Sequence, residues 1–271
     1  QRQLLSTGLG FKRLDTILLT HGHLDHILGL GGIVSTFARW EAIDALTIHG
    51  GQWALDRVRD LMGVVIRGGE TDLALSLSPL EAGPVFQAGD LEVVAFPVQH
   101  RGSGNFGFLF QERSHRPFLV DRAEAFGVPA GPERRRLVAG ESITLADGRL
   151  VRPDDVLGQA EPGTKMVYIG DVARLDNLVT VARRADLLVC ESTYLWEDVE
   201  TARRYGHTTA RQVAEFARAA EVGTLVLTHV SRRYRARDVA AEATGVFPRT
   251  IVAEDLDHFL VRRGVVERAV S

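Results

Sequence analysis

One six-residue segment constrains this chain more than any other feature. The segment HGHLDH, at 21–26, holds three of the nine histidines and an aspartate. It directly follows the apolar run LDTILL at 14–19, which has the composition of a buried strand. Imidazole and carboxylate groups are costly at this density unless they bind a metal or are exposed. His21 and His23 can bind one ion together, and Asp25 and His26, at the start of the next helix, can face a second. A chance cluster on a surface turn is the alternative.

Three more histidine or aspartate residues follow apolar strands in the same way. The segments LEVVAFPVQ, MVYIG and TLVLT are followed by His100, Asp171 and His229. Open α/β sheets place ligand sites beyond the carboxyl ends of their strands, so we expect these side chains to join the first cluster. Any one of them alone could be a polar residue with an ordinary partner in the core. Three other histidines bring no second ligand with them and are predicted to lie outside the site: His49, His115 and His258.

The rest of the chain alternates short strands with helices, which indicates an α/β layered domain. Strands are predicted at 45–48, 91–98, 106–110, 166–169, 187–189 and 225–227. Helices are predicted at 52–62 and 209–220, the second with Thr208 as its N-cap.

The segment 111–164 differs in composition, because it is rich in Pro, Gly and Arg and has no long apolar run. ESITLADGRLV at 141–151 alternates around an Asp-Gly turn, which predicts a small hairpin. We expect a structured but flexible arm inserted into a core of residues 1–110 and 165–271, with a disordered linker as the alternative. The segment 113–136 contains six arginines and only three acidic residues. Charge alone favours a solvated face there.

Composition excludes several classes of protein. The net charge of −3 gives no overall attraction for nucleic acid. The single cysteine, Cys190, is expected in the core and leaves no disulfide framework or cysteine zinc cluster. Without an apolar run that could span a bilayer, or a signal segment, we expect a cytoplasmic protein with no membrane contact. No phosphate loop or nucleophile elbow is present, and GLGG at 29–32 only loosely resembles a dinucleotide fingerprint, so no nucleotide cofactor is expected.

HGHLDH is similar to the H-x-H-x-D-H signature of the metallo-β-lactamase superfamily. Within it, the chain resembles the ribonuclease Z family of tRNA 3′-processing endonucleases. The segment 127–158 resembles that family's protruding arm, and the other matches are YIGDV, CESTY, GHTTA and LTHVSRRY. The resemblance implies a four-layer αββα sandwich with an inserted arm. It also implies that the fold's first strands are missing from this chain, so that the native polypeptide is longer. Val172 stands where the family usually has threonine, which leaves the Asp171 ligand intact.

The resemblance also implies a role for each site residue. One metal would be held by His21, His23 and His100. The other would be held by Asp25, His26 and His229. Asp171 would bind both metals. Asp25 would act as the base for the attacking water. His207, oriented by Glu191, would protonate the leaving oxygen. All-imidazole and carboxylate ligation suits two Zn²⁺ ions, with Mn²⁺ or Fe²⁺ as alternatives.

Three functions remain open from the sequence. The first is an endoribonuclease that cleaves the 3′ trailer from precursor tRNA, with the arm binding tRNA and two copies forming a homodimer. The second is a metal-dependent hydrolase of a small phosphodiester or another ester, without a role for RNA. The third is a non-catalytic RNA-binding protein, against which the complete ligand set argues.

Overall fold

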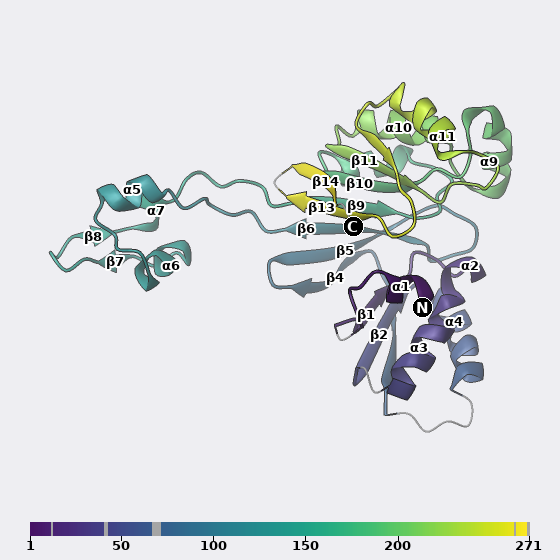
Figure 1. Cartoon of the computed structure of the whole chain (residues 1–271), viewed down its shortest axis with the longest axis horizontal. Helices are drawn as coiled ribbons and strands as arrows, with labels where there is room; N and C mark the ends of the chain where they lie inside the picture. Colours follow the sequence, from purple (N-terminus) through teal and green to yellow (C-terminus); the bar gives the residue numbers. More distant parts are fainter. Residues whose placement is uncertain (12, 41–42, 67–71, 263, 270–271) are drawn as a thin grey trace. The chain divides into compact units, whose positions relative to one another are not determined.

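The computed structural model describes residues 1–11, 13–40, 43–66, 72–262 and 264–269. The chain divides into two compact units (Figure 1). Unit 1 comprises Gln1–Gln111 and Thr164–Ser271, and unit 2 comprises Glu112–Gly163. No helix among the described residues is long and apolar enough to cross a membrane.

The first sheet of unit 1 is parallel, with the order β1-β2-β3: β1 (Thr16–Leu18), β2 (Ala45–Gly50) and β3 (Ala74–Pro79). Parallel neighbours need crossover connections, which α3 (Gly29–Trp40) and α4 (Gln52–Val65) supply. Both helices pack against this sheet in one apolar cluster, where Val34 and Phe37 of α3 and Val58 of α4 lie with Leu46 and Ile48 of β2. Short helices α1 (Arg2–Ser6) and α2 (Leu24–Ile27) lie on either side of β1 in the sequence.

The second sheet has the order β12-β11-β10-β9-β6-β5-β4. Its parallel half contains β9 (Lys165–Ile169), β10 (Leu187–Glu191), β11 (Thr224–Thr228) and β12 (Thr250–Val252). β6 (Phe106–Glu112) runs antiparallel to β9, and β4 (Gly83–Ala88) runs antiparallel to β5 (Leu91–Pro97). The predicted pair at 91–98 and 106–110 is therefore confirmed.

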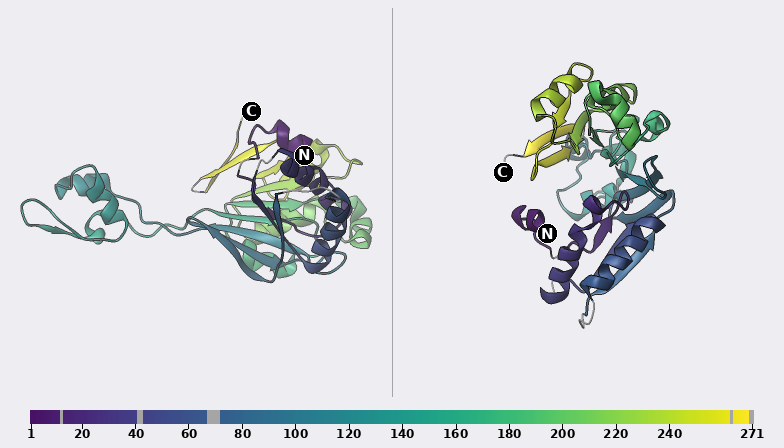
Figure 2. Two further views of the ribbon diagram at one scale, coloured as in Figure 1. Left: turned by 90° about the horizontal axis from the view of Figure 1, so that it is seen from below. Right: turned by 90° about the vertical axis from the view of Figure 1, so that its right-hand side faces the viewer.

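Helices cover the second sheet on one face: α8 (Val179–Ala182), α10 (Ala210–Ala219) and α11 (Ala236–Thr244). A smaller apolar cluster joins Leu18 of the first sheet to Ala95, Phe106 and Phe108 of the second, so the two sheets pack on each other. The layers run helices, sheet, sheet, helices, as Figures 1 and 2 show from three sides. The remaining elements are η1 (Asp176–Leu178), η2 (Trp196–Asp198), α9 (Val199–Tyr205) and the hairpin of β13 (His258–Arg262) with β14 (Val265–Ala269).

The N-cap predicted for α10 was wrong by one residue. Thr209, with extended backbone, accepts a hydrogen bond from the Gln212 N–H, and the Gln212 side chain accepts one from the Thr209 N–H. This reciprocal capping box needs a spacing of three residues. Thr209 and Gln212 have that spacing, so the cap is Thr209 and not Thr208.

Unit 2 has its own hydrophobic core, which its Pro-, Gly- and Arg-rich sequence did not reveal. It contains α5 (Val120–Ala125), α6 (Pro132–Val138), α7 (Pro153–Val156) and the predicted hairpin, formed by β7 (Ile143–Thr144) and β8 (Leu150–Val151). Ala123, Leu137, Val151 and Val156 are fully buried in this core. The chain enters and leaves the unit side by side, because the Gly158 N–H donates to the Pro117 carbonyl at 2.8 Å.

Candidate metal centre

The HGHLDH segment begins in the turn after β1 and continues into α2, with His23 at the N-cap position of that helix. His21 is buried, and its Nδ1 lies 3.1 Å from the Thr20 hydroxyl. Its Nε2 lies 3.1 Å from Nδ1 of His23, so the two rings aim their nitrogens at one point. A side chain at Gly22 would come within 2.7 Å of the Ala54 backbone, which explains why glycine separates the two histidines.

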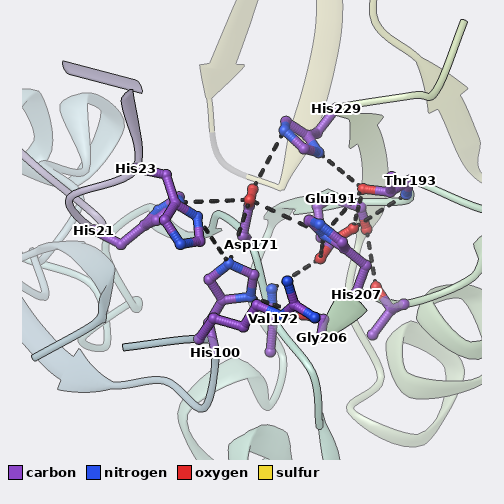
Figure 3. A network of polar contacts seen from close by, with 12 residues as sticks. His21, His23, His100, Asp171, Val172, Glu191, Thr193, Gly206, His207 and His229 are labelled. Carbon is purple, nitrogen blue, oxygen red and sulfur yellow. Dashed lines mark hydrogen bonds and ion pairs between the residues drawn. The ribbon is translucent and has the colours of Figure 1, made fainter. Parts of the chain in front are cut away.

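His100 and Asp171 complete a first group of ligands. The His100 Nδ1–H donates to the Gly206 carbonyl at 2.7 Å, which leaves Nε2 free to bind a cation. That Nε2 lies 3.3 Å from Nδ1 of His23 and 3.7 Å from Oδ2 of Asp171. Figure 3 shows His21, His23 and His100 facing Asp171. One ligand atom from each of these four residues lies within 4.8 Å of all the others.

A second group consists of Asp25, His26 and His229, with the same mutual spacing. His26 Nε2 lies 3.5 Å from Oδ2 of Asp25 and 3.5 Å from Oδ2 of Asp171. His229 Nε2 lies 3.5 Å from the other oxygen of Asp171, Oδ1. His229 adopts φ 55°, a left-handed conformation that few non-glycine residues take. Asp171 is thus within reach of both groups, and all seven predicted ligands converge.

The protonation states of four of the predicted ligands suit cation binding, whereas for His26 burial is outweighed by the contact with Asp171, which raises the pKa. Burial lowers the pKa of His21 to about 3 and also lowers the pKa of His23 and His100. These imidazoles are therefore neutral at pH 7, as ligands must be. Burial opposes ionisation of Asp171, but the surrounding histidines outweigh it and hold its pKa below the usual range. Within the described part of the chain, the buried Oδ1 of Asp171 and Nε2 of His26 have no hydrogen-bond partner, which a bound cation would provide.

Buried Glu191 and half-buried His207 form a pair beside the predicted ligands. Oε1 of Glu191 accepts hydrogen bonds from His207 Nδ1–H at 2.9 Å and from the Val172 N–H at 2.8 Å. Burial opposes protonation of His207, but the contact with Glu191 prevails and raises its pKa. His207 can therefore carry a proton near neutral pH. Val172 contributes only its backbone to this contact, and its side chain is buried in the apolar core.

The three remaining histidines take no part in either group. His49 lies on β2 with its ring 6.2 Å from that of Phe86, and His115 lies 3.8 Å from a Glu161 carboxylate oxygen in unit 2. His258 lies on β13. One residue that sequence reasoning missed is Thr193, whose hydroxyl contacts Glu191, His207 and His229. Its place two residues after Glu191, in CESTY, was the available signal.

Comparisons with known proteins agree with this geometry. A family model described as a β-lactamase superfamily domain matches residues 2–156. A ribonuclease Z from Bradyrhizobium diazoefficiens is 45% identical over 96% of this chain and 87% of its own length. A ribonuclease Z from Haloferax volcanii is 40% identical over 87% of this chain and 74% of its own length.

Solved structures support the fold. The metallo-β-lactamase fold protein YhfI from Bacillus subtilis has a TM-score of 0.63 at 17% identity, covering 98% of this chain and 81% of that one. The short form of human tRNase Z has a TM-score of 0.60 at 22% identity, covering 94% and 82%. The predicted metallo-β-lactamase fold is confirmed, and the chain belongs to the ribonuclease Z family of the metallo-β-lactamase superfamily.

Proposed function

We propose that this protein is a two-metal endoribonuclease that removes the 3′ trailer from precursor tRNA and leaves a 3′ hydroxyl on the tRNA. The observation that carries the proposal is the convergence of seven ligands beside the Glu191–His207 pair. The 45% identity to a ribonuclease Z over 96% of the chain supports the substrate.

In this proposal, His21, His23 and His100 hold one ion, and Asp25, His26 and His229 hold the other. Asp171 would contribute to both sites, because its Oδ2 lies 3.5 Å from Nε2 of His21 and of His26, and its Oδ1 lies 3.5 Å from Nε2 of His229. The donors are imidazole and carboxylate groups only, which suits Zn²⁺ and also accommodates Mn²⁺ or Fe²⁺. Two such ions supply charge stabilisation for the phosphodiester and lower the pKa of water toward about 7.

The chain's own side chains handle the protons. Asp25 is mostly exposed, so its carboxylate can accept the proton that the attacking water loses. The water oxygen forms a bond to phosphorus as the bond from phosphorus to the leaving O3′ breaks. His207 keeps its Nδ1–H on Glu191 and donates the Nε2 proton to that O3′. Because Glu191 is fully buried and its Oε1 accepts the His207 Nδ1–H, it stabilises the imidazolium before the transfer.

We assign tRNA binding to unit 2, and its charges show which arginines are available. Four arginines form ion pairs within the unit: Arg116 with Asp154 at 2.6 Å, Arg134 with Glu124 at 3.7 Å, Arg136 with Glu141 at 2.9 Å, and Arg149 with Asp147 at 2.7 Å. The segment 112–163 contains eight arginines and nine acidic residues, so the unit as a whole is not basic. Phosphate binding would therefore depend on exposed arginines that make no ion pair among the described residues: Arg113, Arg122, Arg135 and Arg152.

We further propose a cytoplasmic homodimer in which unit 2 of one copy serves the metal centre of the other. Mixing a copy that lacks unit 2 with a His207→Ala copy would then restore one complete site per dimer. A monomeric enzyme would gain nothing from the mixture. Gel filtration of the unmixed protein gives the assembly state independently.

One experiment tests the function directly. Purified protein is incubated with a precursor tRNA, with and without chelator, and the new 3′ end is mapped. We expect a single cut after the discriminator nucleotide that chelator abolishes and added Zn²⁺ or Mn²⁺ restores. Hydrolysis of a small phosphodiester without any cleavage of precursor tRNA would instead favour the small-molecule alternative.

A further inference from the structure

The hydroxyl of Thr193 lies between the proton donor and a ligand of the second group. It donates to Oε2 of Glu191, and it lies 2.8 Å from Nδ1 of His229 and 3.3 Å from Nδ1 of His207. Thr193 is buried, and these contacts lie together in Figure 3. One side chain therefore contacts three residues that the proposed mechanism uses.

The proton count fixes the direction of these hydrogen bonds. Oε2 of Glu191 accepts from both the N–H and the hydroxyl of Thr193, and a threonine hydroxyl has a single hydrogen. Since that hydrogen goes to Glu191, the hydroxyl oxygen must accept the hydrogen bond from His229. His229 then carries its proton on Nδ1, and the Nε2 lone pair is left facing Asp171.

We propose that Thr193 is a positioning residue that fixes the tautomer and ring orientation of His229, so that one buried carboxylate, Glu191, orients both the proton donor and a metal ligand. Oε1 of Glu191 orients His207 directly, and Oε2 orients His229 through Thr193. The inference rests on the proposed function, because it assigns His229 to a metal and His207 to proton donation.

The backbone around His229 supports this role. His229 stands at φ 55°, just after the end of β11, so regular strand pairing does not orient its ring. The Ser192 N–H donates to the Thr228 carbonyl at 2.9 Å, and the Ser231 N–H donates to the Thr193 carbonyl at 3.2 Å. Thr193 thus holds the His229 turn by its main chain and the His229 ring by its side chain.

Ser192 provides a matched control. Its hydroxyl is buried beside Thr193 but has no hydrogen-bond partner among the described residues. Replacing it with alanine removes a buried hydroxyl from the same segment without breaking a contact. Thr193→Val removes the hydroxyl while preserving the shape, and Thr193→Ser removes the methyl group while preserving the hydroxyl.

The first measurement is a Zn²⁺ titration of the metal-free full-length protein against a chromogenic chelator, which needs no RNA. We expect Thr193→Val to weaken one of the two equivalents by about 10- to 100-fold, the usual effect of removing a partner of a metal-binding histidine. The other equivalent should stay within about threefold of wild type, and Ser192→Ala and Thr193→Ser should bind both as wild type does. Unchanged binding by Thr193→Val, or equal loss in Ser192→Ala, would overturn the proposal.

The second measurement is made on the wild-type protein, so its result does not depend on the folding of a Thr193 variant. Long-range ¹H–¹⁵N spectra of the zinc-loaded protein report which nitrogen of each histidine carries the proton, and His229→Gln assigns the resonance. We expect His229 to carry it on Nδ1. A proton on Nε2 would refute the role of Thr193 whatever the RNA assay shows, while absent tRNA cleavage would refute only the proposed substrate.

Discussion

Replacement of Gly51 by alanine should disturb the metal centre from a position outside it. Gly51 is the single residue between β2 and α4, and it is the N-cap of that helix. A Cβ atom at this position would lie 1.9 Å from the carbonyl oxygen of Gly104 and 2.7 Å from its carbonyl carbon. Real Cβ contacts are essentially never under 3.0 Å, so the two backbones must separate by about 1 Å. Gly104 belongs to the loop that begins at His100, and the loop must move with it.

Two magnitudes follow from that displacement. Overpacking of a well-packed contact costs about 1–3 kcal/mol of the free energy of unfolding. A displacement of about 1 Å at a reacting centre can lower the rate about 100-fold. We therefore expect Gly51→Ala to unfold at lower urea concentration, to bind Zn²⁺ more weakly, and to lose about two orders of magnitude in kcat on a small phosphodiester.

Gly63 is the matched control, because it lies in the same helix with open space around its Cα. Alanine there should stabilise the protein by about 0.5–1 kcal/mol through helix propensity. Urea unfolding of both metal-free variants shows whether each substitution lowers or raises the free energy of unfolding relative to wild type. The reasoning is refuted if Gly51→Ala is as stable as wild type, or if Gly63→Ala is destabilised to the same degree.

Three more predictions concern the proton donor, acidity and unit 2. His207→Ala should lower kcat on precursor tRNA by about 10²- to 10⁴-fold while two equivalents of Zn²⁺ still bind, and unchanged turnover would exclude it as the donor. The free energy of unfolding of the metal-free protein, measured in urea, should fall as the pH falls from 7 through 6.5. The reason is that His21 takes up a proton in the unfolded chain but not in the folded protein, where burial lowers its pKa to about 3. His21→Gln should make the free energy of unfolding depend less on pH. Deleting 118–156 with a short glycine linker should abolish cleavage of precursor tRNA and spare a small phosphodiester, whereas equal loss of both activities would contradict an RNA-binding unit 2.

Much of the core and the site could be predicted from the sequence. Buried strands such as Leu187–Glu191 are continuous apolar runs, and the residues that follow them must meet at one sheet edge. That rule brings His100, Asp171 and His229 together at one sheet, and the packing of the first sheet on the second places the HGHLDH segment beside them. The pairing of Glu191 with His207, by contrast, came from the family resemblance.

The rest could not be predicted, because it depends on contacts between distant segments. β3 and β4 have mixed burial and polar residues, so only their pairing with β2 and β5 defines them as strands. Unit 2 buries short, scattered apolar residues that show no period in the sequence. The direction of the Thr193 hydroxyl follows only from the coordinates of its three partners.

The side-by-side passage of the chain at Pro117 and Gly158 has an evolutionary consequence. Since the chain enters and leaves unit 2 at nearly the same point, the segment between is an insertion, or cassette, in one surface loop. Closing that loop without the cassette costs little entropy. Related chains could therefore lengthen, shorten or exchange the cassette while the strands on both sides keep their register. Recognition of different RNAs could then diversify in this family without any change to the residues that perform the chemistry.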